Sequence, residues 1–482
     1  MRPKLELLDR TLVNRILGEA LELLDTIGAK IGSVEALEFL RSAGARVDGD
    51  IARLPTSLIR RVLDPAPHDF FLYNRSGEAT VHYGGDDVYF DPGSSCLNIL
   101  DSESQQPRPA TVADLVRMVQ VTEMLPEFAA QATAMVCSDV PSQIGDWYRL
   151  FLVLWYSNKP VVTGAFSVST LKVMLDLLAG DAGGVEYLRE KPRAVFDVCP
   201  SPPLNWSEFA AENIIQLARA NVPAEIVSMP LAGATAPVTL AGAIVQHTAE
   251  CLAGITIHQL ANPGAPIIWG GAPAIFDMST GNTPMGAIET VMLNVGCAQM
   301  GKFLGLPTHG YLVTSDSRQI DTQAGMESGG SALLGALAGI NMISGAGMLD
   351  FLACHSIEKL VMDAEAIASA QRLISGIEAR AATLAVDSFA QTGLHGDFLK
   401  LKETRALFRQ EQHFPSAVID RGTGASSPDI LTRARGRVAD LLRTYQKPDM
   451  PQQRADALLK VASRSARIES FPGLELVTSS HA

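Results

Sequence analysis

The chain has 482 residues, of which 47% are hydrophobic and 19% charged, so it is long enough to bury a large core. Its formal net charge of −13 argues against nucleic acid or an anionic membrane as a partner, because both bind clustered positive charge. The N-terminal residues alternate charged and apolar positions at helical spacing, unlike a signal peptide, and no apolar run spans a bilayer's thickness without small or polar interruption. These features predict a soluble protein of the cytoplasm.

Residues 1–88 differ in pattern from the rest of the chain. Apolar residues at helical spacing predict helices from Arg10 to Ile27 and from Val34 to Ala43. The segments that follow contain Gly and Asp turns between β-rich runs, a composition typical of hairpins. We therefore expect residues 1–88 to form an N-terminal cap.

From about Tyr89 onward the chain repeats one unit, which consists of a short β-rich run, a turn and a helix. The eight runs are VYFDPG, AAQATAMV, KPVVTGAFS, PRAVFDVCP, PAEIVSMPL, APIIWGGAP, PTHGYLVTS and GINMISG. Eight consecutive units of this kind predict an α/β fold, a TIM-type (β/α)8 barrel over residues 89–350. An open, doubly wound sheet is the competing arrangement.

After Leu349 the chain is mainly helical, which predicts a C-terminal helical extension over residues 351–482. These helices either cover the barrel or form an interface between subunits of a homo-oligomer.

Nothing in the sequence indicates a nucleotide or a bound metal. The first strand is not followed by GxGxxG, and there is no GxxxxGK[ST]. The six cysteines are scattered singly, without zinc or disulfide spacing. His247 and Cys251 lie four residues apart on an apolar helix and form the rival zinc site. A buried histidine bonded to a backbone carbonyl is the favoured interpretation, so we predict no metal.

Polar residues concentrate in the segment PTHGYLVTSDSRQIDTQAGMES, which follows the seventh β-rich run. In a barrel this is a loop at the carboxyl end of a strand, where ligands bind. His309 and Tyr311 lie in the strand, and Asp316, Arg318 and Glu327 lie in the loop. We interpret the segment as part of a binding site, with a solvated surface loop as the alternative.

Aromatic side chains recur where the predicted strands end. The candidates are Phe90, Phe166, Trp206, Trp269 and Tyr311. Aromatic faces bind a quaternary ammonium by cation–π attraction, worth about 0.5 to 2 kcal/mol per face when desolvated. We expect these residues to form a cage for such a cation, with ordinary core packing as the alternative for each of them.

Three segments carry a resemblance to a known family. They are PTHGYLVTSDSRQIDTQAGMESG, LLGALAGINMISGAGML and HGDFLKLKETRALFRQEQHFPSAVIDRGT, and they resemble the trimethylamine methyltransferase family over nearly the whole chain. The pyrrolysine of the trimethylamine enzymes should fall within DTQAGMES, at Met326 in our placement. Met cannot form the amine adduct attributed to pyrrolysine, so the resemblance implies the branch of the family that demethylates quaternary amines such as glycine betaine. It also implies that Met326 binds the substrate.

The resemblance implies that the methyl group moves to Co(I) of a corrinoid on a separate small protein, with no cofactor held tightly by this chain. A folate as the final methyl acceptor, in place of the corrinoid, remains an alternative. A carboxylate of the substrate would be bound by Arg318, by His309 or by helix-start amides. Asp316 and Glu327 would orient Arg318 or close the site.

Three alternatives remain at this point. The first is a barrel lyase or hydrolase in which His309 acts with Asp316 or Glu327 as acid and base. The second is methyl transfer from trimethylamine or another methylamine. The third is a non-catalytic protein that binds quaternary amines.

Overall fold

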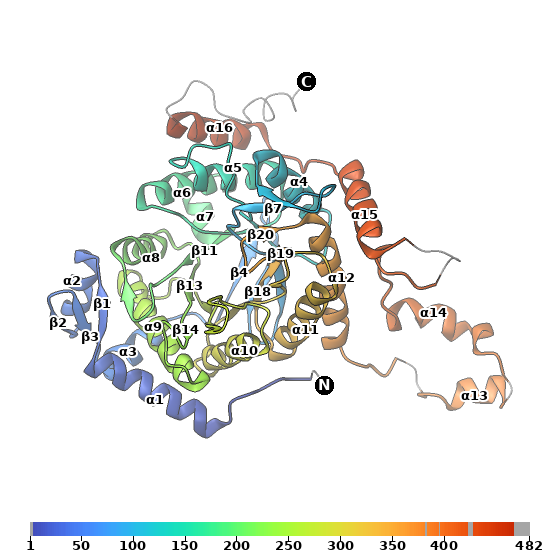
Figure 1. The fold of residues 1–482 in the computed structure, drawn as a ribbon, viewed down its shortest axis with the longest axis horizontal. Helices are drawn as coiled ribbons and strands as arrows, with labels where there is room; N and C mark the ends of the chain where they lie inside the picture. The colour runs from blue at the N-terminus through green and yellow to red at the C-terminus, as the bar shows by residue number, and fades with distance from the viewer. Residues whose placement is uncertain (1–2, 381–382, 395, 423–427, 467–482) are drawn as a thin grey trace.

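The computed structural model describes residues 3–380, 383–394, 396–422 and 428–466. Eight short parallel strands lie at the centre of the molecule, and helices surround them (Figure 1). The strands are β6 (Tyr89–Pro92), β9 (Gln131–Ala132), β10 (Val161–Thr163), β11 (Ala194–Val198), β13 (Ala224–Ser228), β15 (Ile267–Gly271), β17 (His309–Tyr311) and β18 (Met342–Ala346).

The strands pair in chain order, as β9–β10–β11–β13–β15 and as β17–β18 with β6. Two backbone hydrogen bonds close the ring: the amide of Trp269 donates to the carbonyl of Pro307 at 2.9 Å, and the amide of Ala129 donates to the carbonyl of Phe90 at 3.0 Å. The predicted TIM-type barrel is therefore confirmed, and each of the eight predicted runs contains one of its strands.

One principal helix follows each strand. They are α4 (Val112–Glu123), α5 (Gly145–Tyr156), α6 (Val168–Ala182), α8 (Glu208–Ala220), α9 (Leu240–Ala261), α10 (Ile288–Phe303), α11 (Thr322–Ala338) and α12 (Ile357–Ile374), and the short α7 (Val185–Glu190) follows α6. Because α12 packs on α11 and on β18, it completes the eighth unit. The barrel boundary predicted at residue 350 therefore falls one helix too early.

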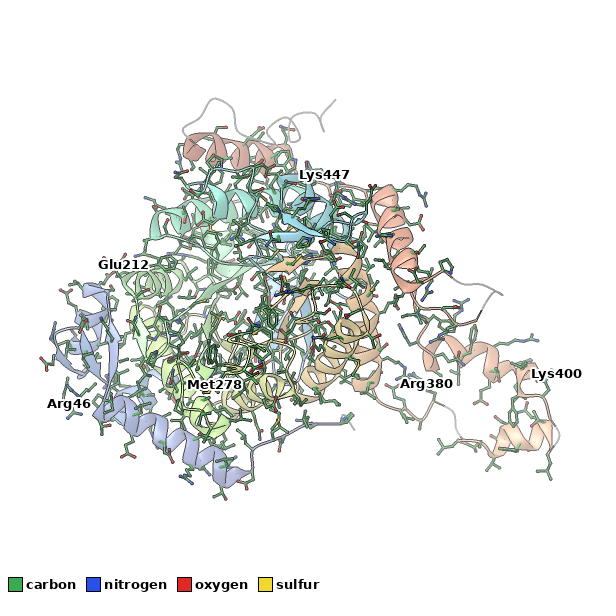
Figure 2. The ribbon with its side chains drawn as sticks, in the orientation of Figure 1. Arg46, Glu212, Met278, Arg380, Lys400 and Lys447 are labelled. Atoms are coloured by element: carbon green, nitrogen blue, oxygen red, sulfur yellow. The ribbon has the colours of Figure 1, made fainter. Side chains whose placement is uncertain are left out.

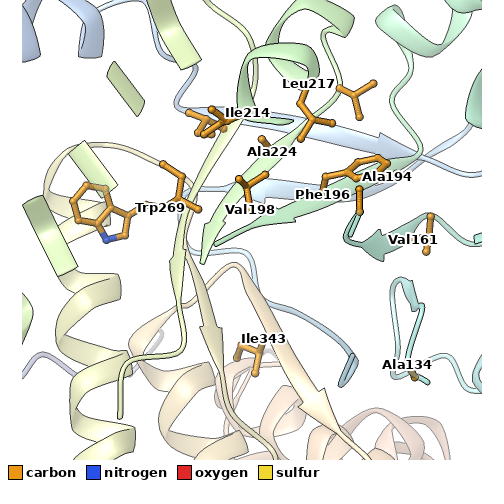
Figure 3. Close-up of a cluster of buried hydrophobic side chains, with 14 of the residues drawn as sticks. Ala134, Val161, Ala194, Phe196, Val198, Ile214, Leu217, Ala224, Trp269 and Ile343 are labelled. Atoms are coloured by element: carbon orange, nitrogen blue, oxygen red, sulfur yellow. The ribbon is translucent and has the colours of Figure 1, made fainter. Parts of the chain in front are cut away.

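Outward-facing side chains of the strands pack against this helix layer. Phe196 and Val198 of β11 share one buried cluster with Ile214 and Leu217 of α8 (Figure 3). Helix α9 is long and apolar enough to cross a membrane, but 78% of its apolar window is buried inside the molecule.

The N-terminal cap begins with α1 (Arg10–Thr26) and contains α2 (Val34–Ser42), each within one residue of its predicted end. It also contains β1 (Ala29–Ile31), β2 (Arg46–Asp48), β3 (Ile51–Arg53) and α3 (Thr56–Leu63), which the sequence pattern did not resolve. Strand β1 pairs with β12 (Asn205–Trp206), which follows β11. The cap is thereby joined to the barrel by a sheet.

A hairpin fills the amino-terminal end of the barrel. Its strands are β4 (Asp69–Tyr73) and β5 (Ala79–Gly84). Leu72, Val81 and Tyr83 of the hairpin form one buried cluster with inward-facing residues of the barrel strands, which are Val162, Val195, Ile268 and Met342. We call this cluster the apolar plug.

Short strands form in the loops at the opposite, carboxyl-terminal end. They are β7 (Asn98–Leu100), β8 (Pro107–Pro109), β14 (Leu231–Ala232), β16 (Ala274–Ile275), β19 (Met348–Leu349) and β20 (Cys354–His355). They tie the loop after β6 to that after β18, and the loop after β13 to that after β15.

After α12 the chain leaves the barrel. It forms α13 (Val386–Thr392), a 3-10 turn (Phe398–Lys400) and α14 (Lys402–Glu411), which bury none of their described residues. Arg380 and Lys400 lie on this projecting segment (Figure 2). Helix α15 (Ile430–Thr444) then packs on α12 and α4, and α16 (Gln452–Ala466) packs on α6.

Candidate active site

Four titratable side chains face the interior of the barrel next to the apolar plug. They are Asp91 of β6, Asp197 of β11, Glu225 of β13 and His309 of β17. Alternate residues of a strand face the same side, so Asp197 follows the inward-facing Val195 two residues later. Asp91, Glu225 and His309 are at most 4% exposed. We call these four residues the acid layer.

The register of the strands brings the members of the acid layer together. Asp197 and Glu225 are direct partners on neighbouring strands. Nδ1 of His309 contacts Oε1 of Glu225, although β15 runs between β13 and β17. Gly270 of β15 makes this contact possible, because a Cβ atom there would lie 2.2 Å from Oε1 of Glu225.

Most polar atoms of the acid layer lack a well-aligned hydrogen bond. These are both carboxylate oxygens of Asp91 and of Glu225, Oδ1 of Asp197, both ring nitrogens of His309 and the neighbouring hydroxyl of Ser344. Buried polar groups in native proteins are nearly always paired, so each orphaned group calls for a partner. Their convergence in one barrel indicates a binding site for a polar or charged ligand.

Burial decides the protonation of the acid layer. It raises the pKa of Asp91 and of Asp197 well above the usual range, and the charge of Glu225 adds to the shift of Asp197. It raises the pKa of Glu225 to about 8, although the neighbouring side chain of Asp197 opposes the shift. It lowers the pKa of His309 to about 4. Burial therefore favours the uncharged form of all four groups in the free protein.

Tyr311 and Phe166 are the two predicted cage residues that the structure brings to this end of the barrel. The ring of Tyr311 lies edge-on to His309, with centroids 6.2 Å apart, and its hydroxyl accepts a hydrogen bond from the amide of Ser94 at 2.9 Å. Phe166 follows β10 and is 52% exposed. One face of its ring is covered by the guanidinium of Arg149, 4.7 Å from the ring centroid.

The cage prediction is wrong for the other three aromatics. The indole of Trp269 points to the helix layer and donates from Nε1 to the carbonyl of Cys297 in α10 at 2.9 Å (Figure 3). Trp206 packs against α9, where a Cβ on Gly254 would lie 2.1 Å from its ring. Phe90 belongs to the core shared with the helices. In parallel strands both faces are apolar, so the sequence does not tell inward from outward residues.

The carboxylates of the polar loop hold the loop together. Asp316 accepts hydrogen bonds from the amides of Met285 and Gly286 at 2.8 and 2.9 Å. Glu327 accepts from the Ser315 hydroxyl at 2.5 Å and from the Asp316 amide at 2.9 Å. These bonds occupy both carboxylates, and His309 contacts Glu225 instead, so the structure does not bring together the predicted pair of His309 with Asp316 or Glu327.

Arg318 and Met326 lie at the surface, which contradicts their predicted roles in binding substrate. The side chain of Arg318 is 76% exposed and pairs with Asp350 at 2.9 Å. Met326 is 71% exposed and lines a cleft of about 590 Å³ between α11 and α12. Neither residue contacts the acid layer.

His247 has the environment predicted from its apolar helix. Its Nε2 donates to the carbonyl of Gly270 at 3.0 Å, and burial lowers its pKa to about 4. Within the part of the chain that the structure describes, no three His, Cys, Asp or Glu side chains are arranged to hold a metal ion.

Asp197 and Glu225 are not among the residues predicted for the site, because aromatic and not acidic side chains were expected to bind the ligand at the strand ends. Their signal is present in the sequence, since each is the single charged residue of a mainly apolar strand, in AVFDV and AEIVS. A charge at such a position is rarely buried unless it has a partner or a function.

A closed barrel with titratable residues near the carboxyl ends of its strands is the architecture of barrel enzymes. The model of the family described as trimethylamine methyltransferase matches residues 1–469. This chain belongs to that family, and it is an enzyme of the methyltransferase class.

Two relatives come from Desulfitobacterium hafniense. A trimethylamine methyltransferase is 30% identical over 92% of this chain and 91% of its own length. A glycine betaine methyltransferase is 28% identical over 97% of this chain and 98% of its own length. A solved dihydropteroate synthase from Coxiella burnetii matches 64% of this chain and 99% of its own at 12% identity, with a TM-score of 0.38. The barrel assignment rests on the strand pairing described above.

Replacing Gly270 by Ala should disrupt the acid layer. The added methyl group would force Glu225 away from His309, and such overpacking costs about 1–3 kcal/mol of unfolding free energy. Denaturant unfolding measures the loss, and Gly330→Ala on α11, where no atom lies within 4 Å of the added group, is the control. Combining Gly270→Ala with Glu225→Ala should relieve the clash, so strictly additive losses would contradict this geometry.

Replacing Glu225 by Gln should flatten the dependence of stability on pH. A carboxyl group whose pKa is raised from 4.5 to about 8 on folding stabilises the protein fully below pH 4.5, and this contribution is lost as the pH rises through 8. At about 1.36 kcal/mol per pKa unit, the parent should lose on the order of 4 kcal/mol more than Glu225→Gln between pH 5 and 9. Unfolding titrations across this range measure it, with the exposed Glu186→Gln as control. Equal slopes for the parent and Glu225→Gln would refute the assignment.

Proposed function

We propose that this protein moves a methyl group from a quaternary amine of the glycine betaine type to Co(I) of a corrinoid carried by a separate protein, in the cytoplasm. The observation that carries the proposal is the acid layer, whose orphaned polar atoms converge inside the barrel of a methyltransferase. The relative named glycine betaine methyltransferase, which matches nearly the whole chain, supports this substrate class.

The acid layer suits a permanent cation. A quaternary ammonium cannot donate a hydrogen bond, so its burial must be balanced by charge or by aromatic faces. Asp91, Asp197 and Glu225 supply the charge, because a cation nearby favours the ionised form of a carboxyl group. Tyr311 and the uncovered face of Phe166 add a cation–π contribution.

The corrinoid supplies the cobalt nucleophile that accepts the methyl group. The chain holds the substrate so that its methyl group faces the open end of the barrel and excludes water from it, which is mainly positioning. As the nitrogen loses the methyl group it gains a lone pair. A carboxyl group of the acid layer that has kept its proton, at Asp197 or Glu225, can donate that proton to the nitrogen, so that the product leaves as a protonated tertiary amine.

The surface around the barrel's open end fits a protein partner. Met229, Val238 and Met278 come from the loops after β13 and β15, and each is at least 40% exposed. Met278 and Val238 both approach Gly233, where an added Cβ would lie 3.1 and 3.7 Å from them. Exposed apolar side chains that gather in this way are typical of protein interfaces.

Binding of the cation should release protons. Because burial raises the pKa of the carboxyl groups of the acid layer and so favours their neutral form, a bound quaternary ammonium should ionise one of them. Calorimetric titration in two buffers with different heats of ionisation measures the number of protons released. The neutral analogue with a tert-butyl group in place of trimethylammonium should bind more weakly and release none. Equal affinity and equal proton release for both ligands would count against a cation site.

Methyl transfer tests the proposal itself. The protein is incubated with a reduced corrinoid protein and with glycine betaine, choline, tetramethylammonium or trimethylamine, and the corrinoid absorbance is followed. We expect demethylation of a quaternary amine and a rate at least about 100-fold lower in Asp197→Asn or Glu225→Gln, as for removal of a proton-transfer group. Chelation should leave the rate unchanged. Activity with trimethylamine alone, or with none of the amines, would refute the proposed substrate class.

A further inference from the structure

Arg149 of α5 is a buried cation, and only one of its three guanidinium nitrogens has hydrogen-bond acceptors among the described residues. The side chain is 1% exposed. Its Nη1 donates to the carbonyl of Thr133 at 2.9 Å and to the hydroxyl of Ser95 at 3.2 Å. Its Nε and Nη2 have no partner among the described residues. A buried guanidinium left in this state is costly unless a ligand completes it.

The guanidinium lies where ligands of a barrel bind. Thr133 directly follows β9, and Ser95 and Phe166 lie in the loops just after β6 and β10, so all three mark the carboxyl ends of strands. Arg149 is also close enough to the acid layer for the charges of Arg149 and Asp197 to shift each other's pKa. The open edge of Arg149 thus belongs to the same end of the barrel as the acid layer.

The nearest acid on the same helix is already occupied. One oxygen of Asp146 accepts from the amide of Trp147 at 2.8 Å. The other accepts from the amide of Phe166 at 2.7 Å and from the hydroxyl of Thr170. Asp146 thereby positions Phe166 over Arg149, and no described carboxylate forms an ion pair with the guanidinium.

We infer that Arg149 binds the carboxylate of a zwitterionic substrate whose quaternary ammonium lies in the acid layer. Nε and Nη2 form one edge of the guanidinium, and that edge matches the two oxygens of a carboxylate in parallel hydrogen bonds. Nη1 is held by Ser95 and Thr133, which fixes the direction of the open edge. This inference rests on the proposed function and assigns to Arg149 the role that the sequence suggested for Arg318.

The site then selects for carboxylate-bearing quaternary amines. A cation of similar shape without the carboxylate would leave the Nε–Nη2 edge of the guanidinium buried and unpaired. The same happens when one partner of a buried charge pair is removed by mutation. Such truncations weaken binding by roughly 30-fold or more. Glycine betaine and its methyl ester test the contribution of the carboxylate to binding most directly, because they share the trimethylammonium group and only glycine betaine carries the negative charge.

Calorimetry of both ligands, without the corrinoid partner, tests the inference. The parent should bind glycine betaine roughly 30-fold or more tightly than the methyl ester. Arg149→Met should remove most of this preference while binding of the ester changes little, and Arg149→Lys should keep part of it, since lysine retains the charge but not the paired edge. The surface variant Arg318→Met should keep the full preference.

The outcomes separate the inference from the proposed function. Arg149-dependent binding of glycine betaine without methyl transfer would count against the proposed function alone. Equal binding of ester and acid by the parent, or binding of neither, would overturn the inference. The comparison on the parent protein requires no variant, so it decides the question even if Arg149→Met fails to fold.

Discussion

The contact between Glu225 and His309 across Gly270 is the constraint on which the site depends. It exists because β15 carries no side chain at that position, so groups from β13 and β17 meet over the intervening strand. The apolar plug below excludes water from one side and raises the cost of any charge. The interior therefore favours the neutral form of its acids, and a ligand with the opposite charge favours the ionised form.

The same sheet-end geometry divides the acidic residues into two groups. Asp146, Glu250, Asp316 and Glu327 accept hydrogen bonds from backbone amides or hydroxyl groups and fix the loops after the strands. Asp91 and Glu225 are buried inside the barrel, where their oxygens lack a well-aligned donor and lie beside Ser344, Asp197 and His309. A loop carboxylate that looks catalytic in the sequence is thus structural here, whereas the reactive candidates lie inside the strands.

The fold was largely predictable because each strand and helix has a local pattern. The eight β-rich runs, both cap helices and the helical character of the chain after Leu349 follow from periodicity and turn residues. Tertiary packing was needed to assign α3 and to place α12 in the barrel and not in the C-terminal extension. The site was predicted in part. His309, Tyr311 and Phe166 reach it, while Trp206 and Trp269 do not, since the direction of a side chain in a strand buried on both faces depends on register. Arg149 could not be found, because its helix is apolar on all sides and its partners come from three separate loops.

The proposed site is bipolar, with acids inside the barrel and a guanidinium at the ends of its strands. A crystal structure of the protein with glycine betaine tests this claim most directly. We predict the trimethylammonium group among Asp91, Asp197 and Glu225, and the carboxylate on Nε and Nη2 of Arg149. Glycine betaine bound elsewhere, such as in the cleft beside Met326, or bound with its carboxylate away from Arg149, would contradict the account.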